Sequence, residues 1–106
     1  MKKQIKDLEL WEVDFLVAKT EGFDVFIKDN KCFIKFICPQ TVDIYSPTTN
    51  PAQAWPVIDR ERIALHPVKQ HYVSWIGLSD KFRGKTSLES AMRCYIASKF
   101  GDEVEI

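Results

Sequence analysis

Hydrophobic and polar residues in the first half of the chain follow a pattern that predicts short β-strands. Two runs rich in Val, Ile and Phe flank Asp29-Asn30, and both of these residues tolerate positive φ. The pattern therefore predicts a hairpin over residues 24–38. Pro39 ends its second strand, because proline cannot donate to the hydrogen-bond ladder. Residues 42–45 predict a third short strand.

The preceding segment, residues 8–20, fits two patterns. Hydrophobic residues from Trp11 to Phe15 alternate with acidic residues, as in a strand, whereas Trp11, Phe15 and Ala18 also lie at helical spacing. Gly22 follows at the place where a helix commonly takes a left-handed C-terminal cap. We therefore expect a helix over residues 8–20.

The strongest helix signal lies near the end of the chain. Thr86 and Glu89 form a capping-box pattern, in which the hydroxyl accepts the amide of the third helical residue and the Glu side chain reaches back. Hydrophobic residues then recur at helical spacing as far as Gly101, which suits the C-terminal cap. The acidic tail, residues 102–106, is expected to be exposed.

Prolines punctuate the middle of the chain. Asn50-Pro51 predicts a helix start, because asparagine caps a helix and proline at the first position loses no hydrogen bond. Pro56 either ends this helix at Trp55 or kinks it, and we expect a kinked helix that resumes over residues 57–62. His66-Pro67 breaks the pattern again.

Together these elements predict an α+β fold in a single domain over residues 1–106. The hairpin over residues 24–38 and a further strand over residues 72–78 are expected to form a small, mainly antiparallel sheet, packed against the N-terminal and C-terminal helices. Residues 79–85 are polar and basic and predict a loop. The length, with 45% hydrophobic and 28% charged residues, is that of one ordinary globular domain.

Charge and length exclude some classes of protein. Fifteen Lys and Arg balance fifteen Asp and Glu, and this zero net charge argues against a dedicated polyanion binder. No hydrophobic run could span a bilayer and no signal peptide is recognisable, so we expect a cytoplasmic protein with no membrane association. An odd set of cysteines without a close pair, Cys32, Cys38 and Cys94, fits that compartment.

Patterns for common catalytic and metal sites are weak. Gly84-Lys85-Thr86-Ser87 looks like the end of a phosphate-binding loop, but such a loop needs glycine where Ser79 stands. Cys32 and Cys38 are roughly 20 Å apart in an extended strand, too far to share one metal ion. Cys94 has no His nearby in sequence to act as its base. We therefore expect no metal, no cofactor and no enzymatic activity.

Two longer segments resemble one family of tailed-phage proteins. The run from Tyr45 to Asn50, continued by Pro56 to Ile63, resembles the YSPST…GPIIERERI signature of a NinX-like family of unknown function. Residues 86–104 resemble its C-terminal signature, and residues 13–19 resemble its start. Residues 50–55 are also similar to a related phage α/β sandwich domain, where such a segment is helical. The resemblance implies a phage or prophage origin, and it implies no activity.

The leading functional hypothesis is a non-enzymatic phage accessory protein that binds an unknown phage or host protein. The segment from Tyr45 to Arg62 combines a proline-rich loop with a helix start, and loops held by a scaffold commonly carry function. Two alternatives stay open: Trp55 and Trp75 are either interface or core residues, and the arginines either bind a partner or pair with Asp59 and Glu61. The candidate contact residues are Tyr45, Ser46, Trp55, Arg60 and Arg62.

The second hypothesis is a nucleic-acid-associated protein of phage replication or host takeover. Residues 81–85 interleave cations with an aromatic ring, a pattern that can follow phosphates, although the neutral net charge weighs against it. The helix start beside them favours negative charge as well. The candidate anion patch comprises Lys81, Arg83, Lys85 and Thr86. The sequence leaves the oligomeric state open.

Overall fold

The computed structural model describes residues 2–36, 40–77 and 81–105. Its strands form three small antiparallel sheets, with the orders β1-β8, β2-β3-β4 and β5-β6-β7, and the predicted α+β class is confirmed. Along the chain the elements are β1 (Lys2–Gln4), the 3-10 turn η1 (Ile5–Asp7), α1 (Leu10–Thr20), β2 (Val25–Lys28), β3 (Lys31–Phe36), β4 (Thr41–Ile44), α2 (Pro51–Glu61), β5 (Ala64–Val68), β6 (His71–Trp75), β7 (Phe82–Gly84), α3 (Ser87–Phe100) and β8 (Glu103–Glu105).

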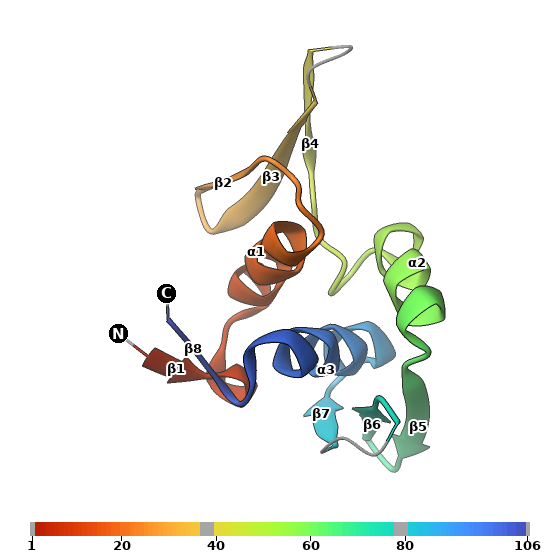
Figure 1. Cartoon of the computed structure of the whole chain (residues 1–106). Helices are drawn as coiled ribbons and strands as arrows, with labels where there is room; N and C mark the ends of the chain where they lie inside the picture. The colour runs from red at the N-terminus through yellow and green to blue at the C-terminus, as the bar shows by residue number, and fades with distance from the viewer. Residues whose placement is uncertain (1, 37–39, 78–80, 106) are drawn as a thin grey trace.

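Helix α3 lies at the centre of the molecule (Figure 1). The sheet β5-β6-β7 lies on one side of it, α1 and α2 lie on the other, and β2-β3-β4 projects beyond α1 at the top of the view. The core is a single hydrophobic cluster between these elements, in which Val13 and Val17 of α1 and Met92 and Ile96 of α3 are fully buried. We call the projecting sheet β2-β3-β4 the wing.

The local predictions for the first half of the chain are confirmed. Asp29 and Asn30 have φ of 53° and 57°, the left-handed pair that a two-residue hairpin turn requires. Helix α1 ends before Gly22, which has φ +84°. The strand predicted over residues 42–45 is β4, one residue earlier. The predicted hairpin end at residues 37–38 and the stop at Pro39 lie outside the described residues.

Helix α2 continues through Pro56, so the prediction that it resumes after this proline is confirmed. The Asn50 side chain accepts a hydrogen bond from the amide of Ala52 at 2.9 Å, as expected for an N-cap. The helix ends at Glu61, and the C-cap residue Arg62 has φ 55°.

The prediction of one sheet was wrong, because the hairpin and β6 belong to separate sheets. Two strands that the pattern missed complete the sheet around β6: β5 includes His66-Pro67, taken above as a break, and β7 lies within the predicted loop over residues 79–85. Pro67 is tolerated because β5 is an edge strand, where a missing N–H leaves no partner unpaired. The end of the strand predicted over residues 72–78 is not described beyond Gly77.

The ends of the chain pair with each other. The prediction of an exposed tail is confirmed for the acidic residues Asp102, Glu103 and Glu105 and is wrong for Val104. Strand β8 pairs with β1, and Val104 is buried in the core. The start of α3 follows half of the predicted capping box. The Thr86 hydroxyl accepts the Glu89 amide at 3.1 Å, but the Glu89 carboxylate accepts the amide of Lys85, at 3.2 Å.

Candidate functional site

The loop from Tyr45 to Thr48 packs against the rest of the protein and has a structural role. Tyr45 is only 4% exposed, and its ring meets that of Phe23 edge-on at 5.3 Å. Burial, with acidic groups nearby, raises the pKa of the Tyr45 hydroxyl. The amide of half-buried Ser46 donates to the side chain of Gln53 at 2.7 Å. The prediction that Tyr45 is a surface contact was therefore wrong, since its ring packs in the core.

Thr48 ties this loop to α1 through a buried carboxylate that the sequence analysis missed. The Thr48 amide and hydroxyl donate to the two carboxylate oxygens of Asp14, at 2.9 and 3.1 Å. Burial raises the pKa of Asp14 to about 6, and the two hydrogen bonds from Thr48 act in the opposite direction. Nearby Cys32 has its pKa raised to about 12, chiefly by burial, so its thiol stays protonated and is a poor nucleophile.

Arg60 also holds the fold together. Its guanidinium donates to both carboxylate oxygens of Glu21, at 3.0 and 2.7 Å, and to Glu61 at 3.0 Å. The Tyr95 hydroxyl donates to the same Glu21 carboxylate at 2.6 Å. The Arg60 hydrogen bonds are the largest cause of a lowered pKa at Glu21. Arg60, itself exposed, thus joins α2 to the end of α1 and to α3, and Trp55, 58% exposed, and Arg62 also lie at the surface.

A second buried charge was also missed. Arg93 of α3 donates to the carbonyls of Ile5 and Leu8, at 2.7 and 2.8 Å, and its Nε donates to Glu89 at 3.0 Å. It lies within the C-terminal signature segment and fastens the N-terminal segment to α3. No local pattern could reveal it, because the acceptors are backbone atoms more than eighty positions away.

The wing presents an apolar outer face that no other described element covers (Figure 1). Its inner face packs on α1 through Cys32 and Ile34. On the outer face Phe26, Phe33 and Ile44 stand side by side in the strand register, and the two phenyl rings stack at 5.3 Å. Val42 and Ile44 of β4 are 51% and 52% exposed. The side chains that define the wing face are Phe26, Phe33, Lys35, Val42 and Ile44.

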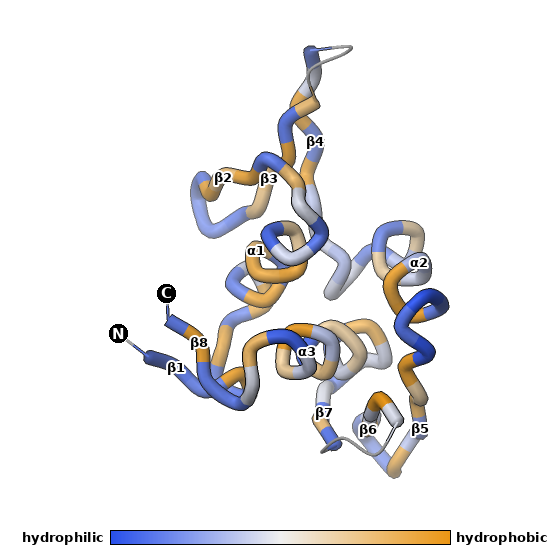
Figure 2. The backbone as a smooth tube through the Cα atoms, viewed as in Figure 1, coloured by the Kyte–Doolittle hydropathy of each residue, from blue (hydrophilic) through white to orange (hydrophobic). Residues whose placement is uncertain are grey.

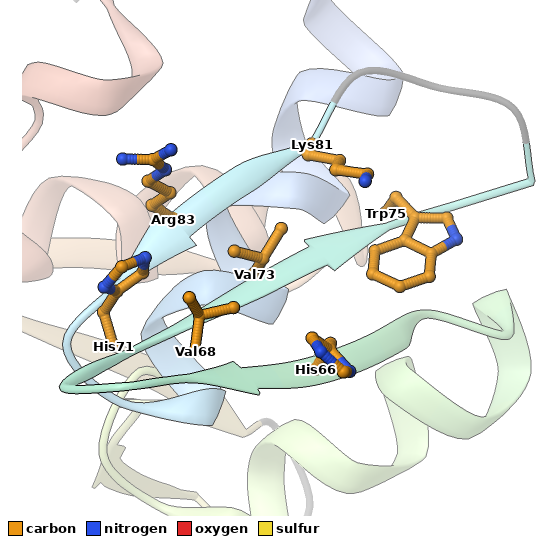
Figure 3. Close-up of a pocket in the computed structure, with 7 residues that line it drawn as sticks. All are labelled: His66, Val68, His71, Val73, Trp75, Lys81 and Arg83. Carbon is orange, nitrogen blue, oxygen red and sulfur yellow. The ribbon is translucent and has the colours of Figure 1, made fainter.

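The open side of the sheet β5-β6-β7 forms a shallow depression of about 560 Å³ (Figure 3). Alternate residues of β6 point into it, while Ser74 between them packs against α3. In the register Val73 lies between His66 of β5 and Arg83 of β7. We call this surface, which is rich in cations and imidazoles, the basic face; its lining is His66, Val68, His71, Val73, Trp75, Lys81 and Arg83.

Of the predicted anion patch, the structure brings Lys81 and Arg83 together on this face. Lys85 and Thr86 are exposed but do not line the depression. Trp75 is half-buried with its ring on the same face, and the Lys81 ammonium lies 5.3 Å from the ring centroid. The sequence analysis named both cations and, separately, Trp75, but it did not bring them together with each other or with the two histidines, because the pairing of β5, β6 and β7 was not predicted.

A family model described as Bacteriophage P22, NinX, matches residues 4–99. The chain belongs to this family. No curated protein matches the chain. The resemblance of the two signature segments to a NinX-like family is thereby confirmed, and the phage NinX family is consistent with a phage accessory protein. In this NinX-family chain the signature side chains Tyr45, Thr48, Arg93 and Tyr95 are buried.

No described helix is long and apolar enough to cross a membrane. Within residues 2–36, 40–77 and 81–105, no group of three or more His, Cys, Asp or Glu side chains could hold a metal ion.

Proposed function

We propose that this NinX-family chain is a non-enzymatic accessory protein that binds a phage or host protein in the host cell cytoplasm. The proposal is carried by the exposed apolar surface of the wing. Of the seven most exposed large hydrophobic side chains in the described part of the chain, four lie on the wing or beside it: Phe23, Phe36, Val42 and Ile44. Figure 2 shows hydrophobic segments along β2 to β4, although this sheet projects from the body of the protein.

An exposed cluster of this kind is characteristic of protein-binding surfaces, because contiguous apolar area is costly to leave in water. The stacked rings of Phe26 and Phe33 are anchors of the type that dominate interface energetics. A groove of about 330 Å³ between the wing and α2, lined in part by Phe36 and Pro56, extends the apolar surface to the inner side of the sheet.

The charges on the wing favour a partner with an acidic rim. Lys28 and Lys31 lie directly opposite each other in the register, and like charges in such a pair destabilise a sheet. Lys35 lies on the same side of the sheet, with its ammonium 5.1 Å from the centroid of the Phe26 ring. Acidic groups around an apolar centre on the partner would relieve this repulsion while the two apolar surfaces meet.

The test is affinity purification from cells in which the phage is growing, with a matched pair of variants. Val42→Ser combined with Ile44→Ser removes apolar side chains from the wing face. Phe100→Ser removes a side chain that is 47% exposed at the far end of α3. We expect a partner that co-purifies with the wild-type protein and the Phe100 variant and is absent with the wing variant.

Two outcomes would contradict the proposal. Retention of the partner by the wing variant, together with its loss on Trp55→Ser and Arg62→Gln, would move the interface to α2. A self-association seen in sedimentation of the purified chain, and abolished by the wing substitutions, would make the occupant of the wing a second copy.

A further inference from the structure

We propose that the basic face of β5-β6-β7 is a binding site for single-stranded nucleic acid, in which Trp75 stacks on a base and Lys81 and Arg83 hold phosphates. This site is separate from the wing and does not depend on the function proposed for it. The inference depends on what three neighbouring strands bring to one side of a sheet.

Strand alternation concentrates the relevant side chains on this side. His71, Val73 and Trp75 follow one another along β6 at intervals of roughly 6.8 Å, the spacing of every second residue in an antiparallel strand. Across the sheet, His66 and Arg83 flank Val73, roughly 9.6 Å apart over two strand spacings. The opposite side is closed by α3, because Gly84 and Ser74 lie directly against Ser90.

The electrostatic character of this surface favours an anion. None of the described residues lining the depression is acidic. Within the described part of the chain neither Lys81 nor Arg83 makes an ion pair, in contrast to Lys3, Arg60 and Arg93, whose carboxylate partners lie within 4 Å. Two uncompensated cations on one surface can bind phosphates even in a chain of zero net charge, because the attraction acts locally.

The Trp75 ring distinguishes a nucleic acid from a simple polyanion. Proteins that bind single strands combine a basic surface with aromatic rings on which bases stack. Here the Lys81 ammonium lies 5.3 Å from the ring centroid, so the cation and the aromatic surface are adjacent. The face is shallow and open, and bases of a single strand are unpaired and free to reach such a ring, whereas those of a duplex are stacked inside it.

His71 adds an unsatisfied polar atom at the same place. Its Nε2 is buried, and in the described part of the chain no other buried side-chain nitrogen or oxygen lacks a hydrogen-bond partner. Buried polar atoms in native proteins are rarely left without a partner. The His71 side chain lines the depression, and a ligand there would reach this nitrogen once the ring turns outward.

The test is fluorescence anisotropy of labelled oligodeoxythymidylate and oligouridylate titrated with the purified chain over a range of salt concentrations. We expect saturable binding that weakens as salt increases. Lys81→Gln combined with Arg83→Gln should reduce the slope of log K against log salt by about 1.4, since each single-strand phosphate contact contributes about 0.7. Trp75→Leu should weaken binding roughly tenfold.

The control is Lys28→Gln with Lys31→Gln, which removes the same net charge from the wing and should leave oligonucleotide binding unchanged. Thermal melts of all variants show whether they fold. The Lys81 and Arg83 side chains are exposed, so the double variant should stay folded and still test the site if Trp75→Leu unfolds. Binding of DNA, RNA or both supports the site and identifies the tolerated sugar.

Three results would overturn the proposal. The first is no oligonucleotide binding at low salt. The second is an equal loss in the Lys28 and Lys31 variant, which would mean that binding follows net charge alone. The third is polyglutamate binding as tight as oligonucleotide binding and unaffected by Trp75→Leu, which would make the face a site for acidic protein segments.

Discussion

Replacing the buried Asp14 carboxylate by an amide should stabilise the protein at neutral pH. Asp14 is 5% exposed, and burial raises its pKa from 3.8 to about 6 in the folded state. The folded state therefore binds a proton more tightly than the unfolded state between about pH 4 and pH 6. In this window the free energy of unfolding falls as pH rises, and above about pH 6 the loss is complete.

The magnitude follows from the shift. A change from 3.8 to about 6 corresponds to about 3 kcal/mol of lost stability once Asp14 is ionised. Asp14→Asn carries no charge and can keep both contacts with Thr48: its carbonyl accepts from the amide, and its NH₂ group donates to the hydroxyl. We expect the variant to be more stable than wild type by up to about 3 kcal/mol above pH 6.

The assay is urea unfolding followed by tryptophan fluorescence, with the difference between variant and wild type measured at a series of pH values. That difference should be near zero below about pH 4 and rise to its full value at about pH 6. Asp59→Asn, on an exposed part of α2, is the control and should show no such rise. Thr48→Val removes one hydrogen bond to the carboxylate, so it should raise the pKa of Asp14 further and destabilise mainly above pH 6.

A variant that is less stable than wild type above pH 6 would refute this reasoning. A difference that is the same at all pH values would refute it too, because the effect would then come from packing and not from charge. The first result would mean that the hydrogen bonds from Thr48 stabilise the ionised carboxylate by more than burial destabilises it, and the second that the two effects balance.

Arg93→Ala should lower the free energy of unfolding, measured with urea, by about 3 kcal/mol, because two buried carbonyls and a carboxylate lose their donor. Full stability of an Arg93→Lys variant would contradict this reasoning, since an ammonium cannot reach all three acceptors. Gly84→Ala should cost about 1–3 kcal/mol in thermal unfolding, because its Cβ would lie 2.4 Å from the backbone nitrogen of Ser90. Glu21→Gln should cost at most about 1 kcal/mol, since Arg60 is half-exposed. The lowered pKa of Glu21 means that its contribution is present above pH 4.5 and lost as pH falls through the folded pKa; a cost that persists in acid would contradict this.

The elements that could be predicted from the sequence are those whose signals lie within a few neighbouring residues. The hairpin needs only two β-rich runs and the positive φ of Asp29 and Asn30, and α3 needs only its cap at Thr86 and helical spacing. Strands β7 and β8 were missed because each has three residues, too few for an alternation of hydrophobic and polar positions to be recognised. The partner of β8 is also at the other end of the chain. Strand β5 was not predicted because it contains Pro67, and proline is accepted there because β5 lies at the edge of its sheet.

The candidate site was harder to predict than the fold. Tyr45 looked like a surface residue but is buried, and Arg60 is exposed but pairs with Glu21, which lies far away in sequence. On the basic face, some residues were predicted and their neighbours were not. Its cations Lys81 and Arg83 were found by composition, but the aromatic ring and imidazoles beside them belong to strands whose pairing no local pattern shows.

The residues that carry the family resemblance explain why family membership identifies a fold and leaves the function open. Thr48 and Arg93 lie in the signature segments, are buried, and bind α1 and the N-terminal segment. Substitutions there should lower the free energy of unfolding whatever the protein binds. The wing face and the basic face lie largely outside those segments, and their exposed side chains contribute little to the core. Binding at these two faces and folding can therefore be separated by substitution.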